Sequence, residues 1–546
     1  MKKLLVVLVL ILACADGAFS MKPKADEVIS MEFSRRKLKR WARHNNYAYV
    51  IVNDIKDFSV KGIEGVIYEL TRNLNLDGKQ LNLLPNSYIK FNGYLITGGK
   101  ITGILKNDIL HAESLGAIPD DAIDDAEPIQ NILNIAQGRV EFNDGTYTLS
   151  RFVEINSDNL DIDGKGCTLL FAPNIELSPA IRVISQNNIL LQNFNIISQN
   201  KYDPANPFPR KVNTKWSNII AIAVSNVNNF TIRNVYFEDV ETAVKIDGGQ
   251  GMSQNVTLSD LHTSATVAMP VYMSHVSNVL MSRCRLEASI DASEYDHHIY
   301  GSSFVQNHNI TKCEFIGGSG IPIHYYSTDS TMADNININD CLFNDTLGSV
   351  INASGTCGSM EFKNSRVESL RSFEQQGVFA AMGDNVLEVK GIYVYTPFQF
   401  LFSATNKAQV SIEDIDASVK GLQCSLPSKN GCVTLANNTI RILDGLSVLY
   451  LSDSISKTVG NILIISNSFV LNPQMYSLFS VRGTINSNLL IEDNTFMCRE
   501  RSRFFFDNKG FSNPHITVTG NKVIGCNSNF PYYDDCMINF SNNIIE

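Results

Sequence analysis

The phrases FTIRNVYF (Phe230–Phe237), ININDCLF (Ile336–Phe343) and LLIEDNTF (Leu489–Phe496) are three copies of a pattern that recurs along much of this chain. In each copy a central apolar residue, which we call the anchor, is followed five positions later by a second apolar residue, usually Phe, Val, Ile or Leu. Successive anchors are mostly about 23 to 29 residues apart, a period that indicates a stack of similar coils. The anchors are Leu191, Ile232, Leu258, Met281, Ile310, Ile338, Phe362, Val389, Ile412, Leu435, Ile464, Ile491 and Val518.

Each copy alternates apolar and polar residues, as a β-strand does, and then reaches a residue suited to a bend. Asn, Asp and Gly adopt a left-handed backbone at low cost, so a single residue of this kind turns the chain without a full loop. Leucine-rich repeats share the period, but these copies have no leucine-rich signature and no helix-length periodic segment. The pattern predicts an all-β, single-stranded parallel β-helix. The predicted bend residues are Asn234, Asp260, Arg283, Lys312, Asp340, Asn364, Gly391, Asp414, Asn437, Asp493 and Gly520.

The composition limits the kinds of partner. Hydrophobic residues make up 44% of the 546 residues and charged residues only 18%, so the chain can bury a substantial core. The formal net charge of −10 argues against nucleic acid or an acidic membrane surface as a partner. A neutral polymer such as a polysaccharide is easier to accommodate.

The first residues, MKKLLVVLVLILACADGA, have the order of a secretory signal, with two lysines, an apolar run and then small residues. We predict a cleaved signal peptide over residues 1–20. The Ala-Cys-Ala arrangement around Cys14 suits ordinary cleavage before Asp16, whereas the residues leading to Cys14 also resemble a bacterial lipobox. The protein is therefore expected to be secreted, periplasmic or at the cell surface, and a lipid anchor on Cys14 is the one membrane attachment that we predict.

Residues 21–110 are predicted to form an N-terminal lead-in and β cap, and residues 111–546 the β-helix. The lead-in contains a basic segment, SRRKLKRWARH (Ser34–His44), which we interpret as a solvated helix, and then the Gly- and Asn-punctuated short strands of Ile67–Gly103. A cap is expected because an uncovered end of a β-helix is an exposed sheet edge. A short capping helix is predicted between Asp124 or Asp125, which would cap it, and Gly138.

The segment Leu115–Ser150 carries a resemblance to a known family. Its order of Gly-Ala, acidic turn, Asp-Asp, Ile-Gln, short helix and then GRVEFNDGTY resembles the first segment of the pectate-lyase-like superfamily of right-handed parallel β-helices. That superfamily includes relatives of glycoside hydrolase family 28, pectate lyases and phage tailspikes, and the upstream stretch is similar to the lead-in of such proteins from gut Bacteroidetes. The resemblance implies a right-handed helix that binds saccharide chains along one lateral face.

In hydrolases of this superfamily, the catalytic carboxylates come from the strand after each phrase, so these strands were aligned. They are AVKID, PVYMS, HHIYGS, IPIHYY and SVINA, which begin at residues 243, 270, 297, 321 and 349. We place Val244, Val271, Ile299, Ile323 and Val350 in the interior. Alternation along a strand then turns Lys245, Tyr272, His298, Tyr300, His324 and Tyr326 outward, where they would form one patch on adjacent coils. Tyrosine rings stack on sugar faces, so Lys245, Tyr272, Tyr300, His324 and Tyr326 are predicted to bind the saccharide.

Glycoside hydrolysis needs two carboxyl groups that flank the bond, one protonated and one ionised. The loop before HHIYGS supplies acids, of which Asp296 and Glu294 are the first candidates for catalysis and Asp291 the next. The alternative reaction, β-elimination from a uronate, needs a base, for which His298, His324, Tyr300 or Lys245 qualifies. It also needs a cation, and Asp239, Asp247 and Asp291 provide oxygens that suit Ca²⁺; the hydrolase needs no cofactor, and no metal ligands are predicted for it.

The series of motifs found in family 28 polygalacturonases, N-T-D, D-D, G-H-G and R-I-K, is absent from the repeats, so we do not expect a typical polygalacturonase. The sequence leaves three readings open, namely glycoside hydrolase, polysaccharide lyase, and a non-catalytic binding or adhesive rod of tailspike type. All three have a polysaccharide as partner.

Cysteines lie three residues after successive anchors, at Cys284, Cys313 and Cys341, so we expect them to stack as buried thiols rather than to bind a metal. Two further pairs are close enough in sequence to bridge a loop, Cys424 with Cys432 and Cys526 with Cys536.

Overall fold

The computed structural model describes residues 29–546 with several internal gaps. The gaps are 61–64, 173–178, 202–218, 250, 291–296, 328–332, 347, 356–357, 369–370, 372–376, 383, 406, 425–430, 444–447, 453–459, 472–476, 483–487, 499–503, 510–514 and 526–536. The predicted signal peptide, Cys14, Asp291, Glu294, Asp296 and the Cys526–Cys536 pair therefore lie outside the described residues. Within the described residues, no helix combines the length and the apolar character needed to cross a membrane.

The chain forms two compact units. One comprises Met1–Asn143 with Ser157–Asp163, and the other comprises Asp144–Asn156 with Gly164–Glu546. The predicted division at residues 110 and 111, and the capping of the β-helix by the lead-in, stay predictions.

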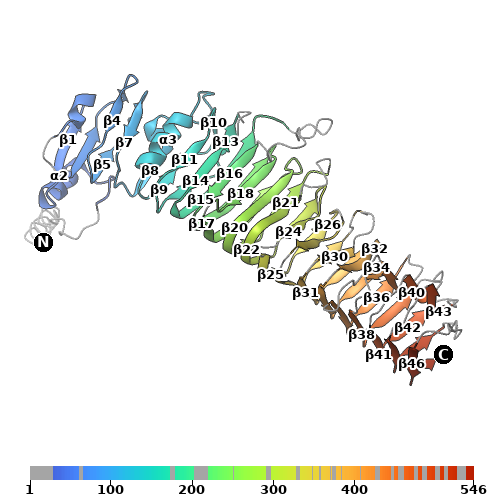
Figure 1. Ribbon diagram of the computed structural model, residues 1–546. Coiled ribbons are helices and arrows are strands. Elements are labelled where there is room, and N and C mark those ends of the chain that lie inside the picture. The colour runs from blue at the N-terminus through green and yellow to red at the C-terminus, as the bar shows by residue number, and fades with distance from the viewer. Residues whose placement is uncertain are drawn as a thin grey trace, which may run out of the picture. The chain divides into compact units, whose positions relative to one another are not determined.

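The described residues of the first unit form two short α-helices and a set of short parallel strands (Figure 1). Strands β1, β2 and β5 form one parallel sheet, and β3 pairs with β6 and β4 with β7. The elements are α2 (Arg35–His44), β1 (Ala48–Val52), the 3-10 turn η1 (Ile55–Phe58), β2 (Val66–Leu70), β3 (Leu74–Asn75), β4 (Gln80–Asn82), β5 (Ser87–Lys90), β6 (Ile96–Thr97), β7 (Lys100–Thr102), β8 (Ile109–His111), the 3-10 turn η2 (Ala112–Leu115), α3 (Ala126–Ile135), β9 (Arg139–Glu141) and β12 (Asp161–Asp163).

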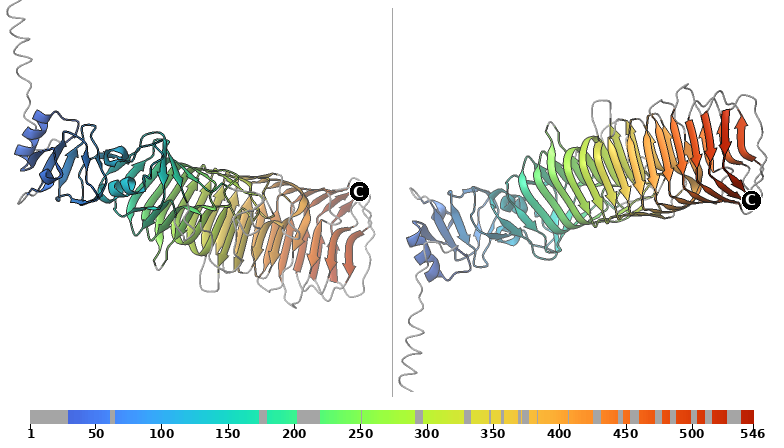
Figure 2. Two further views of the ribbon diagram at one scale, coloured as in Figure 1. Left: turned by 90° about the horizontal axis from the view of Figure 1, so that it is seen from above. Right: turned by 90° about the horizontal axis from the view of Figure 1, so that it is seen from below.

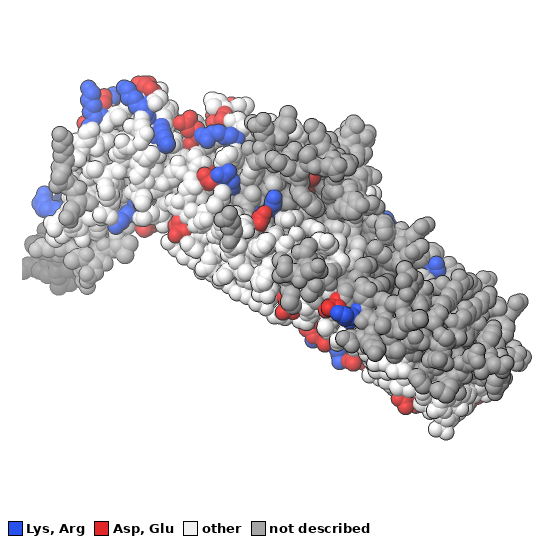
Figure 3. All heavy atoms as spheres, viewed as in Figure 1, with Lys and Arg blue, Asp and Glu red and all other residues white. Residues whose placement is uncertain are grey.

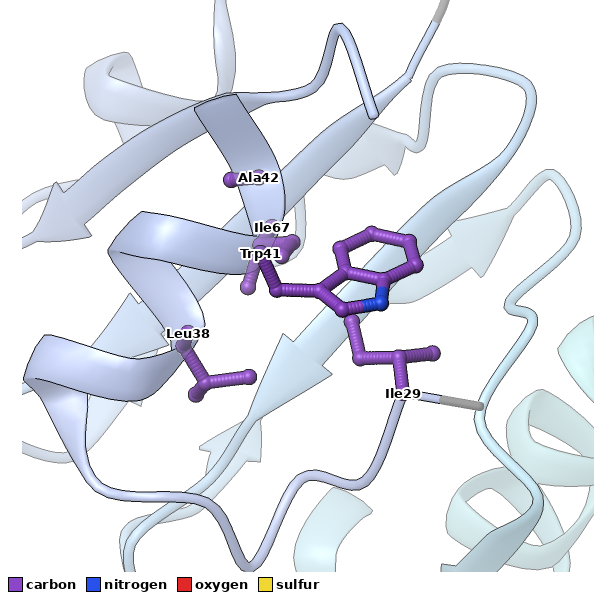
Figure 4. Packing of buried hydrophobic residues seen from close by; sticks show 5 residues of the cluster. All are labelled: Ile29, Leu38, Trp41, Ala42 and Ile67. Carbon is purple, nitrogen blue, oxygen red and sulfur yellow. The ribbon is translucent and has the colours of Figure 1, made fainter. Parts of the chain in front are cut away.

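The basic segment forms helix α2, as predicted. Ser34 caps it by accepting a hydrogen bond from the backbone N–H of Lys37 (3.4 Å), and its inner face buries Leu38, Trp41 and Ala42. Figure 4 shows these three side chains packed with Ile29 and Ile67. The burial of this apolar face explains why a segment so rich in lysine and arginine folds as a helix with a solvated basic side.

The acidic segment before α3 makes structural hydrogen bonds. Asp125 is the N-cap residue, as predicted, but its side chain makes no capping hydrogen bond to the helix. Asp124 Oδ1 accepts from the backbone N–H of Ala126 (3.1 Å), and Asp125 Oδ1 accepts from that of Ile118 (2.9 Å). Asp120 adopts a left-handed backbone with φ of 62°. The helix begins at Ala126, so Pro128 lies within its first turn.

The second unit is a right-handed parallel β-helix whose coils build three ladders of parallel strands, which we call the first, second and third sheets (Figures 1 and 2). The first sheet has its own strands β25 (Ala333–Asn339), β28 (Ser359–Lys363), β31 (Val386–Lys390), β33 (Gln409–Glu413), β35 (Cys432–Ala436), β38 (Asn461–Ile465), β41 (Asn488–Glu492), β44 (His515–Thr519) and β46 (Met537–Ser541). The second has β10 (Thr146–Leu149), β13 (Thr168–Phe171), β21 (Arg285–Ala288), β23 (Glu314–Gly317), β26 (Leu342–Asn344), β29 (Arg366–Glu368), β36 (Thr439–Ile442), β39 (Ser468–Leu471), β42 (Thr495–Cys498), β45 (Lys522–Ile524) and β47 (Ile544–Ile545).

The third sheet, which carries the candidate site, has β11 (Val153–Ile155), β14 (Ile181–Ile184), β16 (Ile220–Ser225), β18 (Thr242–Asp247), β24 (Ile323–Ser327), β27 (Ile351–Gly355), β30 (Gly377–Met382), β37 (Leu449–Ser452), β40 (Ser477–Arg482) and β43 (Phe504–Lys509). Seven longer strands bend and run through two sheets: β15 (Asn187–Ser198), β17 (Asn228–Glu238), β19 (Ser253–Thr263), β20 (Met269–Ser282), β22 (Ile299–Thr311), β32 (Tyr393–Thr405) and β34 (Asp416–Cys424).

The predicted coil register is confirmed along its whole length. Each anchor pairs with the next anchor in the first sheet, from Leu191 with Ile232 to Ile491 with Val518. One further coil follows, in which Phe540 pairs with Val518. The anchors are buried, so the same positions that set the register also fill the core.

All the predicted bend residues have a left-handed backbone, with φ between 48° at Asn364 and 68° at Gly520. Ser466 occupies the corresponding position on its coil with φ of 56°, and Asn193 and Asn542 do so nearer the two ends. A one-residue bend of this kind is the corner between the first and second sheets.

The position after this bend points into the interior and forms a column. Cys284, Cys313 and Cys341 occupy it as buried free thiols on successive coils, as predicted. Toward the C-terminus the same column contains five asparagines, Asn438, Asn467, Asn494, Asn521 and Asn543, each joined to the next by side-chain hydrogen bonds. The repeat pattern in the sequence did not predict this asparagine column.

One of the two possible disulfides is excluded. Cys432 carries a free thiol, so it does not form the bridge to Cys424 that its position in the sequence allowed. Cys498, for which no bridge was predicted, is disulfide-bonded.

Candidate functional site

The third sheet brings the predicted patch residues together on its outer side. Four buried residues pair with one another from strand to strand along this sheet, namely Val244, Val271, Ile299 and Ile323. The residues that follow them form an outward row, in which Lys245 pairs with Tyr272, Tyr272 with Tyr300, and Tyr300 with His324. A second row lies two positions further along the strands and contains Asp247, Ser274, Ser302, Tyr326 and Ser354. We call the set Lys245, Tyr272, His297, Tyr300, His324, Tyr326 and Ser354 the lateral patch.

The rings of the lateral patch contact one another from coil to coil. The ammonium group of Lys245 lies 5.4 Å from the centre of the Tyr272 ring, and the ring centres of Tyr272 and Tyr300 are 5.8 Å apart. The ring of Tyr300 meets that of His324 edge to face at 5.4 Å. Tyr326, in the second row, is 45% exposed. These contacts limit the motion of each ring and give the patch a defined surface.

The prediction that His298 faces outward is wrong. Its side chain is fully buried, and its Nε2 atom lies 3.0 Å from the carbonyl oxygen of Ile316. Burial lowers the pKa of His298 to about 4, so the ring is neutral at pH 7. The chain turns a corner just before Ile299, and two consecutive residues therefore point inward there. The same holds at Ala243 with Val244, which are both buried.

His297, which is only 5% exposed, is the histidine that contacts the outward row in place of His298. Its ring stacks on Tyr300 with centres 5.4 Å apart and an interplanar angle of 16°, and its Nδ1 atom lies 2.7 Å from the carbonyl oxygen of Ile321. The sequence signal for a histidine in the patch was the adjacent pair His297 and His298. The assumption of strict alternation along the strand assigned the wrong one of the two to the patch.

A second correction concerns the strand SVINA. Ile323 pairs with Ile351 and not with Val350, although both residues are buried. Ser354, which the sequence analysis did not single out, consequently joins the outward row beside Tyr326.

A chain of hydrogen bonds crosses three coils of the patch. His297 Nε2 lies 3.0 Å from His324 Nδ1, and His324 Nε2 lies 3.0 Å from Ser354 Oγ. Burial lowers the pKa of His324 to about 4 and raises the pKa of Tyr300 to about 12. Both side chains are therefore neutral at pH 7.

The predicted catalytic acids Asp291, Glu294 and Asp296 lie outside the described residues, as stated above. Of the acids considered for calcium, Asp239 is buried and lies 2.8 Å from the ammonium group of Lys201, and Asp247 accepts from the backbone N–H of Gly249 (3.0 Å). The residues that the structure describes contain no cluster of three or more His, Cys, Asp or Glu side chains placed to hold a metal ion.

A pocket of about 450 Å³ lies away from the patch, over the corner between the first and second sheets. Its lining includes Asn193, Asn234, Asp260 and the rings of Tyr236 and His262, which meet edge to face at 5.3 Å. On the face drawn in Figure 3, most positive atoms of the described β-helix residues lie beside negative ones. Arg182 and Glu154 of this unit form an ion pair with a distance of 2.8 Å.

Comparison with known proteins gives structural neighbours only. No family model and no curated protein matches the sequence. Among solved structures, the chain is similar to the surface adhesin PfbA of Streptococcus pneumoniae, with a TM-score of 0.40 and 15% identity over 77% of this chain and 90% of that one. It is similar to an exopolygalacturonase from Thermotoga maritima, with a TM-score of 0.37 and 12% identity over 66% and 92%. It is also similar to DFA-IIIase from Arthrobacter chlorophenolicus without its lid, with a TM-score of 0.39 and 12% identity over 71% and 95%.

Proposed function

We propose that this chain is an exported protein that binds a polysaccharide along the lateral patch. The observation that carries the proposal is the row from Lys245 through Tyr272 and Tyr300 to His324 on four adjacent strands. Neighbouring strands are about 4.8 Å apart, so the row extends over roughly 14 Å, enough to contact more than one sugar unit. Aromatic rings offer flat apolar faces to pyranose rings, while amine, imidazole and hydroxyl groups bind sugar hydroxyls.

Export is supported by the N-terminal sequence and by the disulfide at Cys498, since disulfides persist in oxidising compartments. We propose export either by ordinary cleavage of the signal peptide or with a lipid anchor on Cys14.

We further propose that the bound chain is cleaved by hydrolysis, with Glu294 and Asp296 as the acid pair and Asp291 as the next candidate. Asp296 directly precedes His297 of the lateral patch in the sequence, and Glu294 and Asp291 lie three and six positions before that histidine. β-Elimination has less support, because a base near neutral pKa is needed. A pKa of about 4 for His324 and about 12 for Tyr300 makes both poor bases for that step. Calcium would be needed only for the elimination.

The binding proposal is tested by retention of the purified full chain on a panel of immobilised plant, host and capsular polysaccharides. We expect retention on at least one of them, reduced at least about tenfold in Tyr300→Ala. The control is Tyr395→Ala, because Tyr395 is also a tyrosine of the outer surface, 46% exposed, but lies in the second sheet. Lack of retention on every glycan, or equal loss in both variants, contradicts the proposal.

Cleavage is tested in the same panel by following new reducing ends and the absorbance of unsaturated uronates. Reducing ends without that absorbance, lost in Glu294→Gln or Asp296→Asn, support hydrolysis. Absorbance of unsaturated products supports the lyase instead. Retention without any product identifies a binding or adhesive rod.

A further inference from the structure

The hydrogen-bond chain of the lateral patch has the arrangement of a nucleophile, a base and a group that orients the base. Ser354 Oγ lies 3.0 Å from His324 Nε2, and the opposite nitrogen of that ring lies 3.0 Å from His297 Nε2. His297 is itself held by the carbonyl oxygen of Ile321, 2.7 Å from its Nδ1 atom. Side chains within hydrogen-bond reach in this order are the signature of an activated serine.

We propose that Ser354, His324 and His297 form a catalytic triad that hydrolyses a carboxylic ester, such as an O-acetyl group, on a hydroxyl of the bound saccharide. The nature of the substrate rests on the proposed polysaccharide binding. The reactivity of Ser354 does not, because it follows from the three side chains alone.

The hydrogen bonds assign the protons of both rings. The carbonyl oxygen of Ile321 accepts only, so Nδ1 of His297 carries a proton, and in the neutral form of this ring Nε2 presents a lone pair. His324 therefore donates from Nδ1 to that lone pair, which leaves the lone pair of its own Nε2 facing Ser354 Oγ. The hydroxyl of Ser354 donates to it. This is the tautomer that a base needs in order to take the serine proton.

The reaction balances with water as the only co-reactant. Ser354 Oγ attacks the acyl carbon while its proton passes to His324 Nε2, and collapse of the tetrahedral intermediate breaks the bond to the sugar oxygen, which takes that proton and leaves as a hydroxyl. Water then attacks the acyl-serine and gives a proton to His324. The acid departs, and the proton returns to Ser354 Oγ.

Two neighbours suit this chemistry. Asn352 lies two residues before Ser354 in β27 and next to His324 in the register, and its buried Oδ1 accepts no hydrogen bond from the described residues. We assign the amide N–H of Asn352 to the negatively charged oxygen of the intermediate, a role that side-chain amides fill in other acyl transfers. Tyr326 pairs with Ser354 and is 45% exposed, so its ring can support the sugar that carries the ester.

The absence of a carboxylate in this triad limits the reaction. A neutral His297 stabilises the charged form of His324 less than a carboxylate does, and burial already holds the pKa of His324 at about 4. A weak base of this kind suffices for an ester, whose alcohol leaves more readily than the amine of an amide. Activity is expected to be lost below about pH 4, where His324 becomes protonated.

The test uses a fluorophosphonate probe on the purified full chain, with the labelled residue located by peptide mass spectrometry. We expect covalent label on Ser354, none in Ser354→Ala, and labelling slowed by about 10²- to 10⁴-fold in His324→Gln. Ser302→Ala is the matched control, because Ser302 lies in the same outward row on a neighbouring coil, and it should label like the native protein. Native protein that takes no label, or label at Ser354 that His324→Gln leaves unchanged, overturns the triad.

The role of His297 is tested through the pH dependence of p-nitrophenyl acetate hydrolysis. His297→Gln keeps a hydrogen-bonding side chain but loses the ring that orients His324, so we expect a lower rate and a shifted pH profile with unchanged thermal stability. An unchanged profile overturns the positioning role.

Acetate release from acetylated xylan then tests the saccharide ester itself. If the fluorophosphonate labels Ser354 but no polysaccharide retains the protein, only the proposed polysaccharide binding is refuted. If a polysaccharide retains the protein but the probe does not label Ser354, only the triad is refuted.

Discussion

His308 Nδ1 lies 2.7 Å from the phenolic Oη of Tyr325, and both side chains are completely enclosed in the interior of the β-helix. His308 occupies a core position between Val279 and Ile336 in the first sheet. Burial lowers the pKa of His308 to about 3, so the ring is neutral at pH 7. The two residues form a buried polar pair in an otherwise apolar column, and each provides the partner that the other needs.

Tyr325→Phe is expected to destabilise the β-helix by about 1 to 3 kcal/mol, because it leaves His308 Nδ1 buried without a partner. His308 Nε2 already has no hydrogen bond among the described residues. The free energy of unfolding from urea titration measures the effect. The double variant with His308→Val should recover part of the loss, since it removes both polar groups. Native stability in Tyr325→Phe would show that the bond contributes nothing.

Gly301→Ala is expected to cost about 1 to 3 kcal/mol through overpacking. Tyr325 follows Gly301 in the register, and a Cβ atom at position 301 would lie 2.4 Å from the Tyr325 ring. In a Tyr325→Leu background the same substitution should cost much less, because the ring is gone. Equal costs in the two backgrounds, measured by urea titration, would refute the steric explanation.

Stability is expected to fall as the pH is lowered from about 6.5 to about 4. Burial depresses the pKa of His298, His308 and His324 to about 4, 3 and 4, below the usual value of about 6.5 in an unfolded chain. In this window the unfolded state binds more protons than the folded state, so the free energy of unfolding decreases on acidification, and it is highest above pH 6.5. Urea titrations at pH 7.5 and 4.5 measure the slope.

The control for this pH dependence is a pair of histidine variants. His308→Val should flatten the slope, whereas substitution of the exposed His262 by Gln should leave it unchanged. A slope that both variants share with the native protein would exclude the buried histidine as a cause.

Asn494→Ala is expected to destabilise the C-terminal coils by about 2 kcal/mol or more. Asn494 Oδ1 accepts from the backbone N–H of Asn467 (2.9 Å), and its Nδ2 donates to the carbonyl oxygen of Ile464 (2.7 Å), so the substitution leaves buried backbone groups unpaired. The exposed Asn488→Ala on the same coil is the control and should change stability by less than about 0.5 kcal/mol. Equal thermal unfolding midpoints for the two variants would contradict the role of the column.

The sequence predicted the architecture of the β-helix well. Anchors such as Ile338 and Phe362 pair as expected, and bend residues such as Asp340 are left-handed as expected. Errors of the patch prediction are confined to the corners of coils. At His298 and at Val350 the chain bends, two consecutive residues turn inward, and the alternation that predicts side-chain direction within a strand no longer applies.

By itself, the sequence determined the coil register, and with it the row of Lys245, Tyr272, Tyr300 and His324. It could do so because parallel pairing repeats the same contacts on every coil. The apolar residues that recur at a fixed interval in the sequence are therefore the same residues whose packing stabilises the stack. The tertiary structure alone decided that His297, and not His298, contacts the ring of Tyr300 in the lateral patch. It alone brought Ser354, 30 positions along the chain, to His324. The directions of these side chains depend on how each corner packs against its neighbouring coils, and no local pattern encodes that packing.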